Sequence, residues 1–215
     1  MIRLLSKNGY IYLFFLFFVC SVSYAQSDST VIKEINNFQL ELNHSYQDST
    51  ESPLLKEDLV DFESLNFYPI HLSYRVVALL KKDTTQPSFE MATSTSRKPK
   101  YKKFGMLEFV LLNKSFSIPV YQNIQLMKDS AYVDYLFFPF TDLSNGDDTY
   151  GGGRYIDLKI PKSDTLILDF NQCYQPYCAY NHKYSCPIPP IENHLDVEIL
   201  AGVRNGMKKI KKIYR

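Results

Sequence analysis

The sequence predicts a mainly β (α+β) fold, in the form of an antiparallel β-barrel or sandwich-like domain with an N-terminal helix. From about residue 68 onward, short segments of alternating apolar and polar residues follow one another with turns between them. These segments do not alternate with helical ones, which argues against a parallel sheet. The chain also carries 17 Tyr and 15 Phe, residue types that favour a half-buried pleated surface.

The start of the chain has the parts of an export signal. Arg3 and Lys7 give a positive first segment, and residues 11–19 form an apolar core rich in Phe. Ser23-Tyr24-Ala25 then supplies small residues at both cleavage-site positions. We therefore expect residues 1–25 to be a signal peptide that is cleaved after Ala25, and the protein to be exported, either periplasmic or extracellular.

The mature chain expected from this cleavage, residues 26–215, has the length of a single domain. The full sequence has a formal net charge of +1, so no global field points to nucleic acid as a partner. Cys20 raises the alternative of a lipoprotein, but the bulky Phe17-Phe18-Val19 stands where a lipobox has small residues. Export would place the other cysteines in an oxidising compartment.

Two stretches near the start of the mature chain are predicted to be helical. The first is a helix over about residues 29–45, expected to lie on the core or on a sheet edge. Its apolar residues at helical spacing are Val31, Ile35, Phe38 and Leu42. Ser52-Pro53 then redirects the chain, because the residue before a proline is pushed out of the helical region. One or two further helical turns are expected within residues 56–65.

The strands expected from the alternating segments are residues 74–81, 89–95, 105–112, 116–121, 132–138, 154–160, 165–170 and 195–200. Asn113-Lys114-Ser115 between two of them predicts a hairpin. Pro119 predicts that the second arm of this hairpin is an edge strand or carries a bulge. In the last segment, alternation predicts that Leu195, Val197 and Ile199 point inward.

Basic residues gather in two runs, at residues 97–103 and at residues 208–215. Basic residues beside aromatic ones can follow a polyanion. Because export makes nucleic acid a poor partner, lipid head groups or acidic glycans are the better candidates. Charge runs at loops and termini are usually solvated. We therefore expect a loop tip and a frayed tail, with weak membrane-surface contact through the basic C-terminus as the alternative.

The region from residue 138 to residue 193 holds the densest turn and side-chain chemistry of the chain. Asn145-Gly146 predicts a tight turn. Residues 151–153, three glycines, let the backbone approach a neighbour closely or bend a strand. No lysine and Ser/Thr pair follows them as a phosphate-binding loop requires. Asp142, Asp147 and Asp148 lie close in sequence, but the glycine is out of register for an EF-type calcium loop.

Two patterns in this region are long and specific. The first is Phe138-Pro139-Phe140-Thr141-Asp142, Asn145-Gly146, Thr149-Tyr150 and Gly153-Arg154-Tyr155. The second is Asp169-Phe170-Asn171, Tyr174, Pro176–Asn181, Tyr184–Pro187 and Pro189-Pro190, closed by Glu192-Asn193 and Ala201-Gly202. Together they resemble the DUF1684 family, a bacterial and archaeal family of unknown function. Weaker agreement near Ser52-Pro53-Leu54 and Gly105 extends the resemblance over most of the mature chain.

The resemblance implies no chemistry, and the chain departs from the family pattern at two positions. Cys173 stands where we expect Ala, and Val203 stands where we expect Glu. A role that the family assigns to that acid is therefore in doubt here.

Arg154 and Asp169 are charged residues inside strand-like apolar segments, where an unpaired charge is expensive. We expect each to be paired, with the other or with Asp142. One interpretation is an ion pair that pins two strands together, which structural pairs commonly do. The other is an arginine presented to a carboxylate or phosphate ligand in a barrel mouth.

Cys178 and Cys186 are separated by a short loop, and in an oxidising compartment a disulfide between them is expected. Such a bridge would stabilise the fold by about 2–3 kcal/mol in the chain-entropy model. Cys173 would then be left over. A rival hypothesis is a zinc or copper(I) site built from Cys173, Cys178, His182 and Cys186. We expect no metal, because exported thiols tend to oxidise.

The function expected from these features is a non-enzymatic module that binds a small ligand or a cell-envelope component, or that is structural. Its site would be formed by the 138–155 and 169–193 segments, with Tyr150 and Tyr180 at the same hollow. The candidate binding residues are Asp142, Tyr150, Arg154, Asp169, Asn171, Tyr174, Tyr180 and Asn181. The alternative is a hydrolase-like or flavin-dependent enzyme in the same pocket. No Gly-x-Ser-x-Gly or His-Glu-x-x-His motif is present, and no cofactor is expected.

Overall fold

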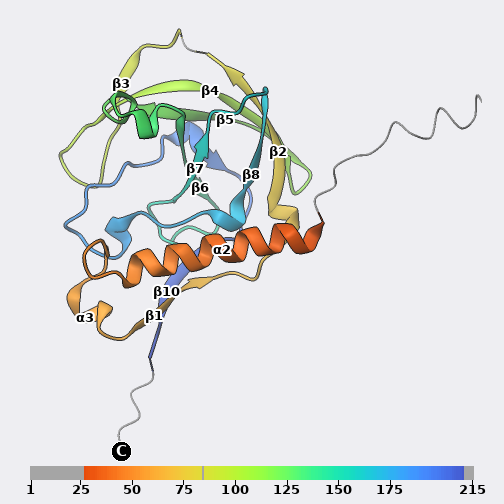
Figure 1. Ribbon diagram of the computed structural model, residues 1–215. Helices are drawn as coiled ribbons and strands as arrows, with labels where there is room; N and C mark the ends of the chain where they lie inside the picture. Colours follow the sequence, from red (N-terminus) through yellow and green to blue (C-terminus); the bar gives the residue numbers. More distant parts are fainter. Residues whose placement is uncertain (1–26, 84, 211–215) are drawn as a thin grey trace, which may run out of the picture.

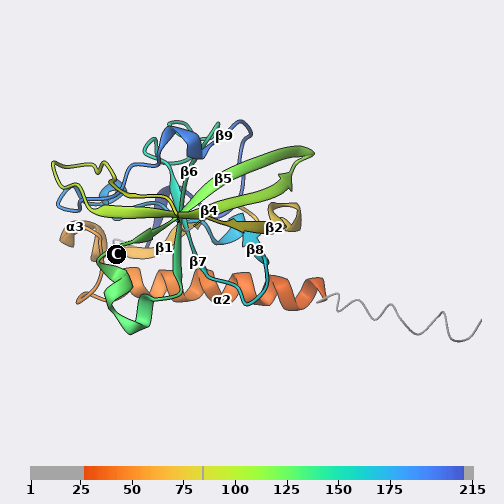
Figure 2. The same ribbon diagram turned by 90° about the horizontal axis from the view of Figure 1, so that it is seen from above.

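The computed structural model shows a curled antiparallel sheet with a long helix along one side (Figures 1 and 2). It describes residues 27–83 and 85–210. The predicted signal peptide, with Cys20 and the cleavage site after Ala25, lies outside the described residues. Within them, no helix is both long and apolar enough to cross a bilayer.

The predicted N-terminal helix is confirmed as α2 (Asp28–Gln47). Val31, Ile35 and Tyr46 are buried against the rest of the fold, as the helical spacing of the apolar residues requires. The second helical stretch is shorter than expected. It is α3 (Lys56–Leu59), a single turn, and the chain then extends into β1 (Phe62–Phe67).

The larger sheet has the strand order β7-β6-β5-β4-β2-β8, with β3 paired to β4 and β9 paired to β6. Neighbours along this order are antiparallel, and the β6–β9 pairing is parallel. The strands are β2 (Arg75–Lys82), β3 (Ser88–Glu90), β4 (Lys100–Leu111), β5 (Lys114–Asn123), β6 (Tyr135–Asp142), β7 (Arg154–Lys159), β8 (Thr165–Asp169) and β9 (His194–Leu195). This confirms the mainly β class, with the sheet curled as a half-barrel.

The β4–β5 hairpin was predicted, but its turn lies one position earlier than expected. Leu112 and Asn113 form it, with φ of 48° and 63°, and Lys114 is already paired with Leu111. Two successive residues with positive φ match the twist of the flanking strands. Pro119 does not mark an edge strand, because β5 lies between β4 and β6. The predicted bulge falls on the partner strand, between Lys103 and Gly105.

The strands β5 and β6 touch at one register pair, Tyr121 and Phe137, and then separate. Pro119 and Pro139 lie on the separating portions and have no N–H to offer a ladder. Asn193 fills the gap between them. Its amide donates to the Pro119 carbonyl at 3.0 Å and to the Pro139 carbonyl at 2.7 Å, and its oxygen accepts from the Tyr121 hydroxyl at 2.8 Å.

Residues 195–200 do not form the predicted strand. After β9 they follow an irregular path, yet their alternation is as expected: Leu195, Val197 and Ile199 are buried, and Asp196 and Glu198 are exposed. The segment predicted at residues 89–95 is also shorter as a strand, since β3 ends at Glu90.

The basic C-terminal run begins as a strand and not as a frayed tail. β10 (Val203–Lys209) pairs with β1 in a smaller sheet (Figure 1). Lys209 lies 2.9 Å from Asp58 and 3.6 Å from Asp61. The last residues of the run, from Lys211, lie outside the described residues.

The glycine that precedes β10 gives a first prediction. Gly202 has φ of 71°, and a Cβ there would lie 2.5 Å from the Cys173 carbonyl oxygen and 2.8 Å from that of Phe170. We expect Gly202→Ala to lower the free energy of unfolding by about 2 kcal/mol or more, because strain and backbone overlap add. Chemical denaturation would measure this.

The matched control is Gly146→Ala. Gly146 has φ of 95°, and no heavy atom of the described chain lies within 4 Å of the added Cβ. This variant isolates the cost of the left-handed backbone, so equal losses at the two glycines would contradict the steric argument.

Candidate functional site

The strands β6 and β7 carry aromatic residues on both of the faces that they share. Leu136, Phe138 and Ile156 point into the main core. Because strand residues alternate between faces, Phe137 and Tyr155 point to the opposite side, where they join a second cluster of buried rings. A cavity of about 370 Å³ opens on this second side.

The wall facing this aromatic surface comes from the segment after β8. Tyr174 pairs with Tyr155 through backbone hydrogen bonds of 2.9 and 3.0 Å, at the outer edge of β7. The Tyr155 hydroxyl donates to the Pro187 carbonyl. Phe38 and Leu42 of α2 and Leu126 complete the lining. Segments far apart in sequence therefore enclose the cavity, which we call the aromatic cavity.

Two of the ring pairs in the aromatic cavity meet edge to face, and a third is tilted. The centroids of Phe137 and Tyr155 are 4.8 Å apart at an interplanar angle of 72°, and those of Tyr155 and Tyr174 are 5.9 Å apart at 89°. Tyr101 and Phe137 follow at 5.8 Å and 36°. Such arrangements are favourable beyond the area that the rings bury, so the wall is built from rings that hold one another in place.

Asp157 is the carboxylate in this lining. It pairs in register with Phe137 across β6 and β7. The Tyr135 and Tyr174 hydroxyls both donate to its Oδ1, at 2.6 and 2.8 Å. Removal from water by the surrounding rings raises the pKa of Asp157, and the two phenol hydrogen bonds oppose this. The residue is nevertheless exposed at the mouth of the cavity.

No cation compensates this carboxylate within the part of the chain that the structure describes. None of the ion pairs there includes Asp157. Lys159, on the same face of β7, extends to Asp134 and is largely exposed. Asp157 therefore differs from Asp142 and Asp169, the buried carboxylates of this region, which have basic partners.

Arg154 and Asp142 form the buried pair that the sequence predicted. The guanidinium Nη2 lies 2.8 Å from Asp142 Oδ2, and both side chains are fully buried. Arg154 also donates to the carbonyls of Ile199 and Ala201 at 2.8 and 2.7 Å. Since every one of these partners belongs to the protein, this arginine holds the fold and is not presented to a ligand.

Asp169 pairs with Arg75 of β2 at 3.0 Å, and not with Arg154 as the sequence also allowed. Its other oxygen accepts from the backbone and side-chain amides of Asn171. Asn171 in turn exchanges hydrogen bonds with the backbone of His71 at 3.0 and 3.1 Å. These contacts tie the end of β8 to the start of β2, so both predicted binding residues are structural.

Tyr150 and Tyr180 line a common hollow, as expected, although it is a separate and smaller one of about 240 Å³. The Tyr180 ring also packs edge to face on Tyr46 of α2 at 5.1 Å. Asn181 is buried and caps a turn by accepting from the Lys183 amide. Of the eight predicted binding residues, Tyr174 lines the aromatic cavity. The eight residues do not converge on one site.

Cys178 and Cys186 are buried free thiols close to each other, with the Cys178 amide 3.2 Å from Cys186 Sγ. The hydrogen bond from Cys186 lowers the pKa of Cys178 to about 6 and raises that of Cys186. Cys173 lies elsewhere, against the Ala201 carbonyl at 3.4 Å, and burial raises its pKa to about 11. The rival metal set is not assembled, and no other group of metal-ligating side chains is gathered in residues 27–83 and 85–210.

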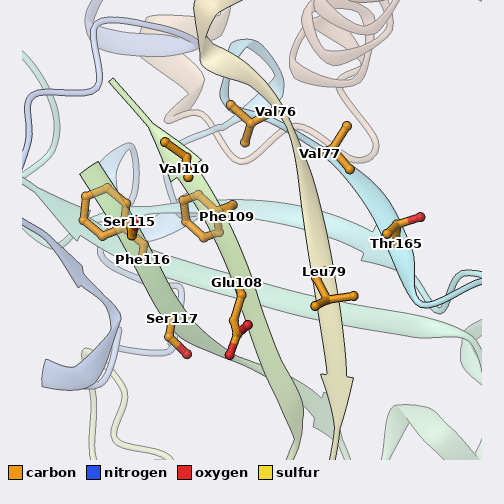
Figure 3. Close-up of a pocket in the computed structure, with 10 residues that line it drawn as sticks. All are labelled: Val76, Val77, Leu79, Glu108, Phe109, Val110, Ser115, Phe116, Ser117 and Thr165. Atoms are coloured by element: carbon orange, nitrogen blue, oxygen red, sulfur yellow. The ribbon is translucent and has the colours of Figure 1, made fainter. Parts of the chain in front are cut away.

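A larger hollow of about 820 Å³ lies over β2, β4, β5 and β8 (Figure 3). It is broad and shallow, and its rim includes the exposed Val77 and Val110. Phe109 and Phe116 stack at its floor at 5.5 Å. Glu108, its charged residue, is already paired with Lys81 at 2.7 Å. Size favours this hollow, but it is more open than the aromatic cavity and its charged residue already has a partner.

The sequence interpretation missed Asp157, Tyr135 and Tyr155, the residues that give the aromatic cavity its chemistry. A signal was present. The segment of β6 is apolar or aromatic at both parities from Tyr135 to Phe140, which is unusual for an antiparallel strand with one solvated face. β7 gives no such signal, because Ile156-Asp157-Leu158-Lys159 alternates as in a strand with one solvated face.

Comparisons with known proteins place these features in context. A family model described as a protein of unknown function (DUF1684) matches residues 60–204. The NMR structure of an uncharacterized protein from Haloarcula marismortui is similar, with a TM-score of 0.65 and 30% sequence identity, covering 82% of this chain and 95% of that chain. No curated protein matches. Nothing in these matches supports the alternative of an enzyme.

The buried ion pair gives a second prediction. We expect Arg154→Met to lower the free energy of unfolding by about 3–5 kcal/mol, because it leaves the Asp142 carboxylate buried without its cation. Urea denaturation would measure the loss. As a control, Lys81→Met removes the partly exposed pair with Glu108 and should cost less than about 1 kcal/mol. Similar losses in both variants would show that Arg154 does not clamp the fold.

Proposed function

The chain belongs to the DUF1684 family, and we propose that it is an exported, non-enzymatic module that binds a small ligand in the aromatic cavity. The observation that carries this proposal is Asp157, a carboxylate held by two phenol hydroxyls in an aromatic wall with no ionic partner in the described chain. A carboxylate whose pKa is raised by the rings around it gains from a positive partner. One left open at the mouth of a cavity is available to a ligand.

The dimensions and rigidity of the aromatic cavity support the proposal. Its volume of about 370 Å³ lies within the range of about 300–1,000 Å³ that is typical of small-molecule sites. One wall is a pair of hydrogen-bonded strands, β6 and β7. The facing wall is pinned by the backbone bridge of Tyr174 and by the hydroxyl of Tyr155 on Pro187. A preformed site of this kind loses little conformational entropy on binding.

We also propose that Cys178 and Cys186 form a disulfide after export. Their proximity, with the Cys178 amide 3.2 Å from Cys186 Sγ, supports this, because an oxidising compartment favours the bridge. Cys186 and Pro187 belong to the lining of the aromatic cavity. A bridge at this position would fix the wall that faces β7.

A third prediction tests the aromatic cavity. Leu126 is 37% exposed at its lining, and we expect Leu126→Trp to fill the mouth. With choline and 3,3-dimethyl-1-butanol as probes, backbone NMR of the wild type should show shifts centred on Tyr155, Tyr174 and their neighbours. The apparent affinity obtained from these shifts should be at least tenfold weaker in the variant.

The control is Leu143→Trp, which adds the same ring at a 49% exposed site outside this lining. It should bind the probes as the wild type does. Shifts centred on Val77 and Phe116, in the broad hollow, would contradict the assignment of the site.

A fourth prediction concerns the thiols. Protein secreted into an oxidising compartment should have a mass lower by two hydrogens than the reduced chain, with peptide mapping linking Cys178 to Cys186. Reduction should cost about 2–3 kcal/mol of stability. Cys173→Ala, which removes the third thiol, should leave this mass difference unchanged. A linkage that includes Cys173 would contradict the proposed pairing.

A further inference from the structure

We infer that the ligand of the aromatic cavity carries an alkylated ammonium group, which lies against Asp157 and the surrounding rings. This inference rests on the proposed function, because it names the chemistry of the molecule that the same cavity would take. Three features support it: the unused oxygen of Asp157, the commitment of the nearby hydroxyl donors, and the density of aromatic surface.

The two oxygens of the Asp157 carboxylate differ in their surroundings: Oδ1 accepts hydrogen bonds, and Oδ2 is open. Tyr135 and Tyr174 both donate to Oδ1. Oδ2 has no hydrogen-bond or ionic partner within residues 27–83 and 85–210. The two donors orient the group and support its charged form. A positive group on the ligand would supply the counter-charge that this stretch of the protein lacks.

Three of the tyrosine hydroxyl groups around the cavity are already committed. Tyr135 and Tyr174 donate to Asp157, and Tyr155 donates to the Pro187 carbonyl. A carboxylate or phosphate placed among these rings would find few free donors and would face a negative charge. A neutral polyol would lose hydrogen bonds to water without recovering them. The chemistry of the wall therefore selects against anionic and strongly polar groups.

The rings favour a positive group that is itself partly apolar. Cations are attracted to the faces of aromatic rings, most strongly when they are desolvated. A primary ammonium is compact and strongly hydrated, which opposes its entry into an aromatic enclosure. Alkyl groups on the nitrogen reduce that hydration and add apolar contact. Phe137, Tyr155 and Tyr174 supply the rings at centroid separations of 4.8 and 5.9 Å.

The surface beside the aromatic cavity adds a feature that suits a longer ligand. A neighbouring hollow shares Tyr101, Leu126 and Pro187 with the cavity and is bordered by Arg97, Lys100 and Lys128. An anionic group a short distance from the ammonium would find basic side chains there. The same ammonium chemistry occurs in free small molecules and in phospholipid head groups, and the experiment has to separate these two sources.

The fifth prediction compares choline with 3,3-dimethyl-1-butanol, its uncharged carbon isostere. Calorimetric titration of the full mature chain should give at least about tenfold tighter binding of choline, since a cation in an aromatic enclosure beside a carboxylate gains about that much. Asp157→Asn should remove most of this preference and leave the affinity for the isostere unchanged.

Two variants separate the role of the charge from that of the hydrogen bonds. Asp157→Asn replaces an exposed side chain, so its thermal unfolding should match that of the wild type. Tyr135→Phe keeps the ring and frees Oδ1 from one donor, and it should retain the preference for choline. Loss of the preference in Tyr135→Phe but not in Asp157→Asn would overturn the inference.

The outcomes also separate the inference from the proposed function. Equal binding of choline and its isostere at the cavity would overturn the ammonium inference and leave a ligand-binding cavity standing. No binding of either compound at the cavity would overturn both. For the source, flotation with phosphatidylcholine vesicles but not with phosphatidylglycerol vesicles would indicate a lipid head group, and choline binding without flotation would indicate a free molecule.

Discussion

The guanidinium of Arg154 is the contact on which the rest of the structure depends. Its donors reach the carboxylate of Asp142 and the backbone carbonyls of Ile199 and Ala201. Asp142 in turn accepts from the amide of Ile199 at 3.1 Å. One buried charge pair therefore satisfies backbone groups of Ile199 and Ala201, in a segment that has no strand partner of its own after β9. Without it, that backbone would be buried with unmet hydrogen bonds, at a cost comparable to the loss of the bonds themselves.

The segment that Arg154 and Asp142 hold leads into the smaller sheet. The irregular segment leads through Gly202 directly into β10, which pairs with β1. The amide of Tyr68, just after β1, donates to the Gly202 carbonyl at 2.9 Å. The same side of the molecule receives α2, whose Tyr46 packs on Tyr180. The helix α2, the smaller sheet and the curled sheet thus meet around this short segment. The aromatic cavity lies on the face of β6 and β7 that points away from the main core.

The sequence predicted those parts of the fold that depend on local patterns. The long helix, the β4–β5 hairpin and the inward alternation of Leu195, Val197 and Ile199 follow from periodicity and turn chemistry, and they are confirmed. The pairing of Arg154 with Asp142 follows from the cost of a buried charge. Periodicity could not predict which strands pair when they are far apart in sequence. β10 needs β1 as a partner, and residues 195–200 lack one, although their alternation is that of a strand.

The site was harder to predict than the fold, for a physical reason. The sequence drew attention to charged residues in apolar surroundings, and Arg154, Asp169 and Asn171 are structural because burial forces them to find partners within the protein. Asp157 escaped notice because it lies on the second face of a strand whose first face is core. The segment that covers this face comes from residues 174–187, and only the three-dimensional arrangement brings it there.

The two faces of β7 also separate the demands of folding from those of recognition. Ile156 and Leu158 serve the core, and Arg154 serves the clamp, whereas Asp157 lies between them with its side chain at the surface. At the proposed site, an exchange at Asp157 would alter the charge offered to a ligand without disturbing the interior. During divergence of duplicated copies, such a position is free to acquire a new preference in few steps. A scaffold of this design can keep its architecture while its descendants change the molecules that they recognise.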